Sequence, residues 1–223
     1  MEVSKDVKIE TETAFIVAHQ GILRLLCAQL ANNKEYGKPR FRNCACLKID
    51  TEDHTISLVY SDKDVDDQPI SNNTPEKFWT KKSFNDKFTT NTTTKDIVKQ
   101  NIELIKNNYK TIYLVRHGQG THNIANMIAK TTTSNPELTI DGKKQAQILG
   151  KAIFSSSESD NSILFPLKKN IIANTVDFFV SILSRTWETL SYILRENNQK
   201  QNYKINPYVL SGIIEFSYKY KKN

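Results

Sequence analysis

The sequence predicts an α/β fold, a three-layer α/β/α sandwich around a mostly parallel sheet, built as one domain over residues 1–223. Short apolar runs, suited to strands buried on both faces, occur at 14–18, 111–115 and 177–182. Each run leads through a polar turn into a segment with apolar residues at helical spacing. Only 7 glycines and 6 prolines are present, which disfavours a turn-rich all-β chain. Alternating strands and helices of this kind favour a parallel sheet covered by helices.

The first strand-turn-helix unit stands near the beginning of the sequence. Residues 14–18 read AFIVA and predict a buried strand, after which His19-Gln20-Gly21 forms a polar turn. A helix is expected over 22–30, because its apolar residues fall on one face. These residues are Ile22, Leu23, Leu26, Cys27 and Leu30. The polar turn is expected at the sheet edge where α/β proteins bind their ligands.

A β-hairpin is expected next, with strands over 44–50 and 55–60 around a polar turn. Cys44 and Cys46 would share one face of the first strand, so we expect two buried, reduced thiols. With Cys27 they make an odd set, and no second pair stands at zinc-binding spacing. The cysteines therefore predict no metal site.

Residues 61–94 show the weakest periodic apolar pattern of the sequence. We expect them to form a linker that lies on the surface. From Thr94 onward a helix is predicted, because apolar residues recur at helical intervals. These residues are Val98, Ile102, Ile105 and Tyr109.

The second unit begins with the strand at 111–115 and the turn at 116–120. A helix is expected to start at 123–130, and a longer one to run over 138–154 with Thr139 as its N-cap. The residues of this longer helix that we expect to be buried are Ala146, Leu149, Ala152 and Ile153. Both helices would return the chain toward the next strand of the sheet.

The third unit follows the same plan. Its strand is predicted over 177–182, and its helix over 184–195. The side chains that we expect to face the core from this helix are Trp187, Leu190 and Leu194.

The net charge of +7 permits an anionic partner, such as a nucleic acid, an acidic membrane or a phosphorylated small molecule. No segment combines a dense lysine and arginine run with stacking aromatics, so ordinary solvated lysines are the preferred interpretation. Residues 1–12 lack the apolar region of a signal peptide, and no apolar run reaches membrane-spanning length. We therefore expect a cytoplasmic protein with neither a nucleic-acid nor a membrane partner.

The residues that carry chemistry stand where the strand at 111–115 ends. The imidazole of His117 could attack phosphorus through its unprotonated nitrogen, and Arg116 offers a planar fork of donors to phosphate oxygens. Gly118 and Gly120 would let the backbone approach a phosphate. Arg-His-Gly alone recurs by chance, and a strand-end histidine packed against a loop is the competing interpretation.

The longer run LVRHGQGTHN, from Leu114 to Asn123, resembles the opening motif of the histidine phosphatase superfamily, also called phosphoglycerate mutase-like. It is most similar to the phosphomutase-like branch. Three more elements resemble the superfamily and occur in its order: Leu138-Thr139-x-x-Gly142-x-x-Gln145-Ala146, Ser181-x-x-x-Arg185-x-x-x-Thr189, and the segment 210–215 that ends at Glu215. The resemblance implies a phosphoglycerate mutase-like fold.

One element of the superfamily, a second histidine near the C-terminal end, is not found in its usual place. Residues 14–26, which contain His19, resemble it. We interpret this as a circular permutation, in which 12–60 correspond to the superfamily's C-terminal part and 111–216 to its N-terminal part. A surface linker and a helix, over 61–110, would join the two. Alternatively, His19 completes the pocket of a second subunit by swapping, and the oligomeric state stays open.

The resemblance also implies the roles of the site residues. His117 would be the nucleophile, and Glu215 would protonate the leaving oxygen and later act as a base. Glu188 and Glu196 compete with Glu215 for that assignment. The residues that would hold the phosphate are Arg116, Arg185, Asn123 and His19. His19 would also take part in catalysis, and Asn123 could instead cap the turn. No cofactor and no metal are implied.

The resulting prediction is a phosphatase that acts on a phosphomonoester, a phosphorylated small molecule, through a phosphohistidine intermediate. One alternative is a phosphoglycerate-type mutase, which would need a longer segment between the acid and His19 to close over its substrate. The other is a catalytically inactive phosphate-binding module. Because the segments that choose the substrate vary within the superfamily, the sequence does not predict which phosphomonoester is bound.

Overall fold

The structure is a computed structural model, and it describes residues 11–30, 38–39, 41–61, 79–80, 92–124, 135–197 and 207–209. Over 38–39, 79–80 and 92–99 it describes the backbone alone. Three of the predicted features therefore fall outside the described residues, wholly or for the most part. They are the linker over 61–94, the helix expected over 123–130, and the segment 210–215 with Glu215.

The described strands form a six-stranded sheet in the order β4-β3-β6-β1-β7-β8. Their bounds are β1 Thr13–Ala18, β3 Cys46–Asp50, β4 Thr55–Tyr60, β6 Thr111–Arg116, β7 Val176–Val180 and β8 Tyr208–Val209. β6, β1, β7 and β8 are parallel, whereas β3 is antiparallel to both β6 and β4. A separate short pair, β2 (Lys38–Pro39) and β5 (Trp79–Thr80), is antiparallel. The α/β class and the mostly parallel sheet are confirmed.

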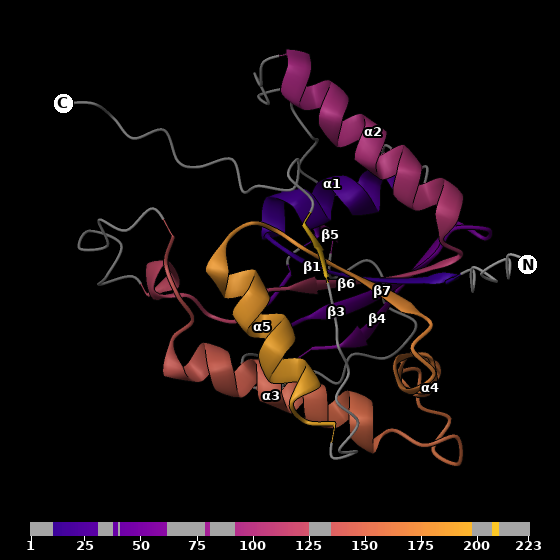
Figure 1. Cartoon of the computed structure of the whole chain (residues 1–223), viewed down its shortest axis with the longest axis vertical. Coiled ribbons are helices and arrows are strands. Elements are labelled where there is room, and N and C mark those ends of the chain that lie inside the picture. Colours follow the sequence, from indigo (N-terminus) through magenta and orange to yellow (C-terminus); the bar gives the residue numbers. More distant parts are fainter. Residues whose placement is uncertain are drawn as a thin grey trace, which may run out of the picture.

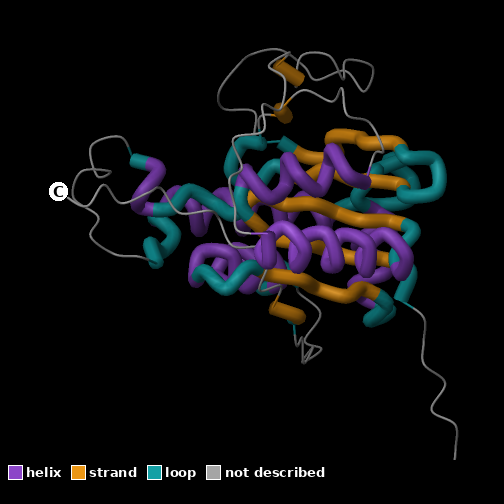
Figure 2. Tube along the Cα trace, turned by 90° about the horizontal axis from the view of Figure 1, so that it is seen from above, coloured by secondary structure: helices purple, strands orange, loops and turns teal. Residues whose placement is uncertain are grey.

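Helices cover both faces of this sheet (Figure 1). Their bounds are α1 Gln20–Leu30 and α2 Thr92–Asn108 on one face, and α3 Ile140–Ser155, α4 Phe165–Ile172 and α5 Ser184–Leu194 on the other. Alternate residues of β1 and β6 enter two separate core clusters. Ile16 and Ile112 pack toward α1 and α2, while Phe15 and Tyr113 pack toward α3, α4 and α5. Figure 2 shows the strands side by side with helices over them. The predicted three layers are present.

Most of the predicted elements agree with the structure. The strand at 14–18 is β1, buried along its whole length, and α1 buries all five apolar residues expected of it. Thr139 caps α3, since its side-chain oxygen accepts a hydrogen bond from the N–H of Gly142. Cys44 and Cys46 are buried thiols that are not joined by a disulfide, as expected. Among the described residues, no helix combines the length and apolar character needed to cross a bilayer.

Three predictions about the elements need correction. The first hairpin strand begins at residue 46, because Cys44 adopts φ 57° in a turn. The segment before residue 125 is a 3₁₀ turn over Thr121–Asn123, and Ile124 is extended, so no α-helix begins at Asn123. Trp187 was expected inward but is 38% exposed. The buried face of α5 consists instead of Arg185, Thr186, Thr189, Leu190 and Ile193. The helix α4 and the strand β8 were not predicted.

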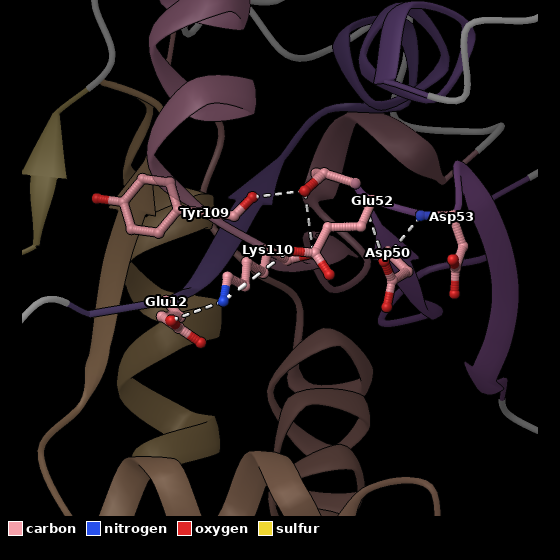
Figure 3. A network of polar contacts seen from close by, with 7 residues as sticks. Glu12, Asp50, Glu52, Asp53, Tyr109 and Lys110 are labelled. Atoms are coloured by element: carbon pink, nitrogen blue, oxygen red, sulfur yellow. Dashed lines mark hydrogen bonds and ion pairs between the residues drawn. The ribbon is translucent and has the colours of Figure 1, made fainter.

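Polar contacts hold together the ends of β1 and β6 that lie opposite the histidines, where both strands begin (Figure 3). The backbone N–H groups of Lys110 and Thr111 both donate to the carbonyl oxygen of Glu12, at 3.0 and 3.1 Å. Thr51, in the β3–β4 turn, donates from its hydroxyl to the Tyr109 carbonyl oxygen at 2.8 Å. The Lys110 ammonium lies 3.0 Å from the Glu12 carboxylate, although this pair is exposed and stabilises little. These contacts set β1 and β6 in register.

Candidate active site

His19 and His117 meet because they follow two neighbouring parallel strands. β1 pairs with β6 in a register that joins Ala18 to Arg116, so the next residue of each strand reaches the same edge. The N–H of His117 donates to the Ala18 carbonyl oxygen at 3.1 Å, and the two imidazole centroids lie 5.0 Å apart. The prediction that both histidines lie together within one chain is confirmed.

The hydrogen bonds of His117 define its protonation state. Its Nδ1–H donates to the Gly118 carbonyl oxygen at 2.6 Å, and its Nε2 accepts from the Nε–H of Arg185 at 3.3 Å. The ring is buried, and burial, with the nearby His19 and Arg185, holds its pKa well below the ordinary 6.5. His117 is therefore neutral at neutral pH, with the lone pair on Nε2.

Arg185 lies in the first turn of α5, and its guanidinium is inside the protein. Thr189, one turn later, donates from its hydroxyl to the Arg185 carbonyl oxygen at 2.7 Å. The same hydroxyl accepts the N–H of Gly118 at 3.0 Å. One threonine thus joins the start of α5 to the loop that follows His117, which fixes Arg185 relative to the imidazole.

Arg116 supplies a second guanidinium from the last position of β6. Its Nη1 donates to the Phe41 carbonyl oxygen at 2.7 Å. Nearby, the side-chain amide of Asn43 donates to the His117 carbonyl oxygen at 3.2 Å. The N–H of Cys44 donates to the Arg116 carbonyl oxygen at 3.0 Å. The segment that precedes β3 therefore holds the end of β6 from one side.

His19 is fully buried, and its Nε2 lies 2.9 Å from the Ser181 hydroxyl. Burial, followed by the charges of Arg185, His122 and Arg116, lowers the pKa of His19 from 6.5 to about 3. The imidazoles of His19 and His117 are consequently both neutral at neutral pH. The fixed positive charge of the site comes from its two arginines.

Asn123 and His122 lie in the 3₁₀ turn after the loop. The side-chain oxygen of Asn123 accepts the N–H of Gly120 at 3.0 Å, so this atom caps the turn, which is one of the two roles predicted for the residue. The ring of His122 lies 5.7 Å from that of His117, centroid to centroid. The sequence supplied no specific role for His122, because only the fold of the turn brings its ring close to His117.

The glycines of the loop make room for other parts of the protein. A Cβ at Gly118 would lie 2.4 Å from the carbonyl oxygen of Gly142, and a Cβ at Gly142 would lie 2.1 Å from that of Gln119. A Cβ at Gly120 would meet the ring of His122 at 2.7 Å. We predicted that Gly118 and Gly120 would allow a phosphate to approach the backbone. The structure shows that they allow the loop to pack on α3 and on His122.

The proton donor is not placed by the described residues, since Glu215 lies outside them. Glu188, one of the competing acids, accepts the N–H of Leu138 at 3.3 Å, and burial raises its pKa. Glu188 therefore holds the backbone of Leu138, just before α3 begins. Within the described part of the chain, no group of three His, Cys, Asp or Glu side chains could hold a metal ion.

Comparison with protein-family models identifies the region that surrounds these residues. The model described as "Histidine phosphatase superfamily (branch 1)" matches residues 112–218. Residues 112–218 belong to the histidine phosphatase superfamily. No curated protein and no solved structure gives a significant match to the chain.

The histidine phosphatase region includes Arg116, His117, Arg185 and Glu215. It does not include His19, which comes before it in the sequence. The match to this superfamily supports an activity in phosphoryl transfer, of the phosphatase or the mutase type. His19 enters the pocket from a strand outside the matched region, and β1 lies between two of its strands, β6 and β7. The cluster of His19, His117 and Arg185 is therefore built by segments on both sides of the long connection between residues 61 and 110.

Proposed function

We propose that the protein is a phosphatase that cleaves a phosphomonoester of a small molecule through a phosphohistidine at His117. The observation that supports this most strongly is the pair of hydrogen bonds on that imidazole. Nδ1–H donates to the Gly118 carbonyl oxygen, so the lone pair is on Nε2, where it accepts the Nε–H of Arg185. A buried nucleophile with an unprotonated nitrogen next to a phosphate-binding cation is what the first step of this chemistry needs.

The proposed reaction has two steps. In the first, Nε2 of His117 attacks phosphorus, the P–O bond to the substrate breaks, and Glu215 gives its proton to the leaving oxygen. In the second, water attacks the phosphohistidine, the P–N bond breaks, and Glu215 takes a proton from the water. The products are an alcohol and inorganic phosphate, and the enzyme returns to its starting state.

Charge and burial support a phosphate ligand in this pocket. Arg116 and Arg185 bring two permanent positive charges to a site whose two imidazoles are neutral, which suits a phosphate dianion. Arg185 is almost completely buried, so it is held in place before substrate binds. Preorganised charge of this kind stabilises the transition state of phosphoryl transfer, because it needs no reorientation during the reaction.

We also propose that the chain is a circular permutation of the superfamily fold, nearest its phosphomutase-like branch. Support comes from β1, which inserts as a parallel strand between β6 and β7 and brings His19 beside His117. Because sheet packing depends on which elements meet and not on where the chain starts, such a rearrangement preserves the pocket. A cytoplasmic location is proposed with it, and the three buried cysteines, none of them in a disulfide, favour a reducing compartment.

The proposal is tested by phosphate release from aryl and alkyl phosphates, with His117→Ala as the matched inactive variant. Hydrolysis by the native chain and none by the variant is the expected result. A mutase would instead move the phosphoryl group to a hydroxyl of an added phosphoglycerate and release little inorganic phosphate. A chain that binds inorganic phosphate without turnover of any ester would be a binding module, and the proposal would be wrong.

A further inference from the structure

The Ser181 side chain contacts the imidazole of His19. β1 and β7 are parallel, and their register pairs Val17 with Val180, so the residues that follow both strands meet at one edge. Both side chains are fully buried, and the Ser181 hydroxyl oxygen lies 2.9 Å from Nε2 of His19. The contact joins residues that are far apart in sequence and depends on the position of β1 in the sheet.

The backbone of Ser181 is held on both sides. Its N–H donates to the Val17 carbonyl oxygen at 3.4 Å, and its carbonyl oxygen accepts the Thr186 hydroxyl at 2.9 Å. Thr186 is itself fully buried in α5. The Ser181 hydroxyl is therefore presented to His19 from a fixed position.

The state of His19 limits how it can bind an anion. A neutral imidazole carries a single N–H, and only that nitrogen can donate to a phosphate oxygen. Because Ser181 contacts Nε2, a hydrogen bond from His19 to phosphate must come from Nδ1. This requires the tautomer with hydrogen on Nδ1, in which Nε2 is an acceptor. A serine hydroxyl can donate to that acceptor, whereas a carbonyl oxygen in its place would select the opposite tautomer.

We propose that Ser181 is a positioning residue whose hydroxyl donates to Nε2 of His19 and so holds the imidazole in the Nδ1–H tautomer that can bind phosphate. The inference deepens the proposed phosphatase function and rests on it for the identity of the ligand. Ser181 itself does not touch the substrate. Its effect passes through His19, in the way that the partner of one imidazole nitrogen sets the chemistry of the other.

The tautomer is measured by ¹⁵N NMR on the full chain with labelled histidine side chains. There are 4 histidines, and the signals of His19 are those lost in His19→Gln. Protonated and unprotonated imidazole nitrogens resonate far apart, so each is identified directly, with and without inorganic phosphate. The expected result is a protonated Nδ1 and an unprotonated Nε2. A protonated Nε2 as the major form overturns the inference.

Variants separate this role from simple packing. Ser181→Ala should shift His19 toward the Nε2–H form and lower kcat/KM about 10- to 100-fold, by analogy with the loss of the partner that orients a metal-binding histidine. Ser181→Thr keeps the hydroxyl and should keep the native tautomer. The control is Ser156→Ala, which removes another buried hydroxyl, bonded to the Ile153 carbonyl oxygen at the far end of α3. An unchanged tautomer in Ser181→Ala contradicts the proposal.

Failure of this inference is distinguishable from failure of the proposed function. An active enzyme whose His19 carries its hydrogen on Nε2 would retain the phosphatase function and exclude the role of Ser181. A chain without phosphatase activity whose His19 shows the Nδ1–H form, dependent on Ser181, would retain the tautomer control and lose the function. If Ser181→Ala does not fold, the native chain and Ser181→Thr still decide the tautomer question.

Discussion

The Nε atom of Arg185 lies 3.3 Å from Nε2 of His117, and both side chains are almost completely buried. In the proposed phosphohistidine, Nε2 would carry the phosphoryl group. The Arg185 guanidinium would then lie beside the phosphate oxygens and could donate hydrogen bonds to them. A planar fork of donors fits this task, and the single ammonium of lysine does not reproduce it.

Arg185→Lys is therefore expected to lower kcat/KM about 100- to 1000-fold, the range for loss of one preorganised transition-state donor. Steady-state kinetics with an aryl phosphate measures the effect. Arg195→Lys is the matched control, because Arg195 stands at the other end of α5 over the ring of Tyr192, 4.9 Å from its centroid. Equal activity of Arg185→Lys and Arg195→Lys would show that Arg185 does not hold the phosphate.

Gly118→Ala is expected to destabilise the fold by about 1–3 kcal/mol, the usual cost of overpacking. The added Cβ would lie 2.4 Å from the backbone oxygen of Gly142, which belongs to α3 and has no freedom to rotate away. Gly21→Ala is the control, since a Cβ there meets nothing within 4 Å and the residue lies in α1. Urea unfolding of both variants compares them, and equal free energies of unfolding would contradict the packing described for the loop.

Acid should destabilise the protein below pH 6.5. The folded pKa values of His19, about 3, and of His117 lie below the ordinary 6.5, so the unfolded chain binds protons that the folded chain excludes. Above pH 6.5 this difference in proton binding is absent. As the pH falls from 6.5 toward the folded pKa values, the free energy of unfolding decreases by up to about 1.4 kcal/mol per pH unit for each histidine. Urea unfolding between pH 7.5 and pH 5 measures the slope.

The double variant His19→Gln, His117→Gln should flatten the decrease of stability with pH, because it removes both groups. An equally steep decrease in the variant would assign the acid sensitivity to other residues.

A mixture of His19→Ala and His117→Ala, unfolded together and refolded, is expected to stay inactive. His19 and His117 lie together within one chain, so each variant would lack one of the two proposed groups. If the N-terminal segment were exchanged between subunits, mixed dimers would contain one intact pocket and activity would return. Recovery of activity on mixing would favour swapping over permutation within one chain.

Local patterns predicted the elements whose apolar residues form a continuous run or one regular face. β1 and β6 are short continuous apolar runs, and α1 and α3 have apolar residues at helical spacing. The short helix α4 has only eight residues, with Pro166 in its first turn, and eight residues are too few for a clear periodic pattern. Trp187 was misplaced because the inward face of α5 starts with polar site residues and not with apolar ones.

The site was predicted to the extent that its residues stand in short motifs. His117, Arg116 and Arg185 occupy such positions, and His19 was found because its segment resembles a displaced element of the superfamily. The hydroxyls of Ser181 and Thr189 and the ring of His122 act through contacts between distant segments. No spacing rule reports such contacts, because they depend on strand order and on the packing of α5 against the loop.

The central claim is that His117 carries the phosphoryl group, and trapping the intermediate tests it most directly. The protein is mixed with a ³²P-labelled phosphomonoester, stopped in alkali within the first turnover, and digested. We predict label on the peptide that contains His117, stable in base, lost in acid, and absent from His117→Asn. Label on another residue, or unchanged turnover by His117→Asn, would contradict the account.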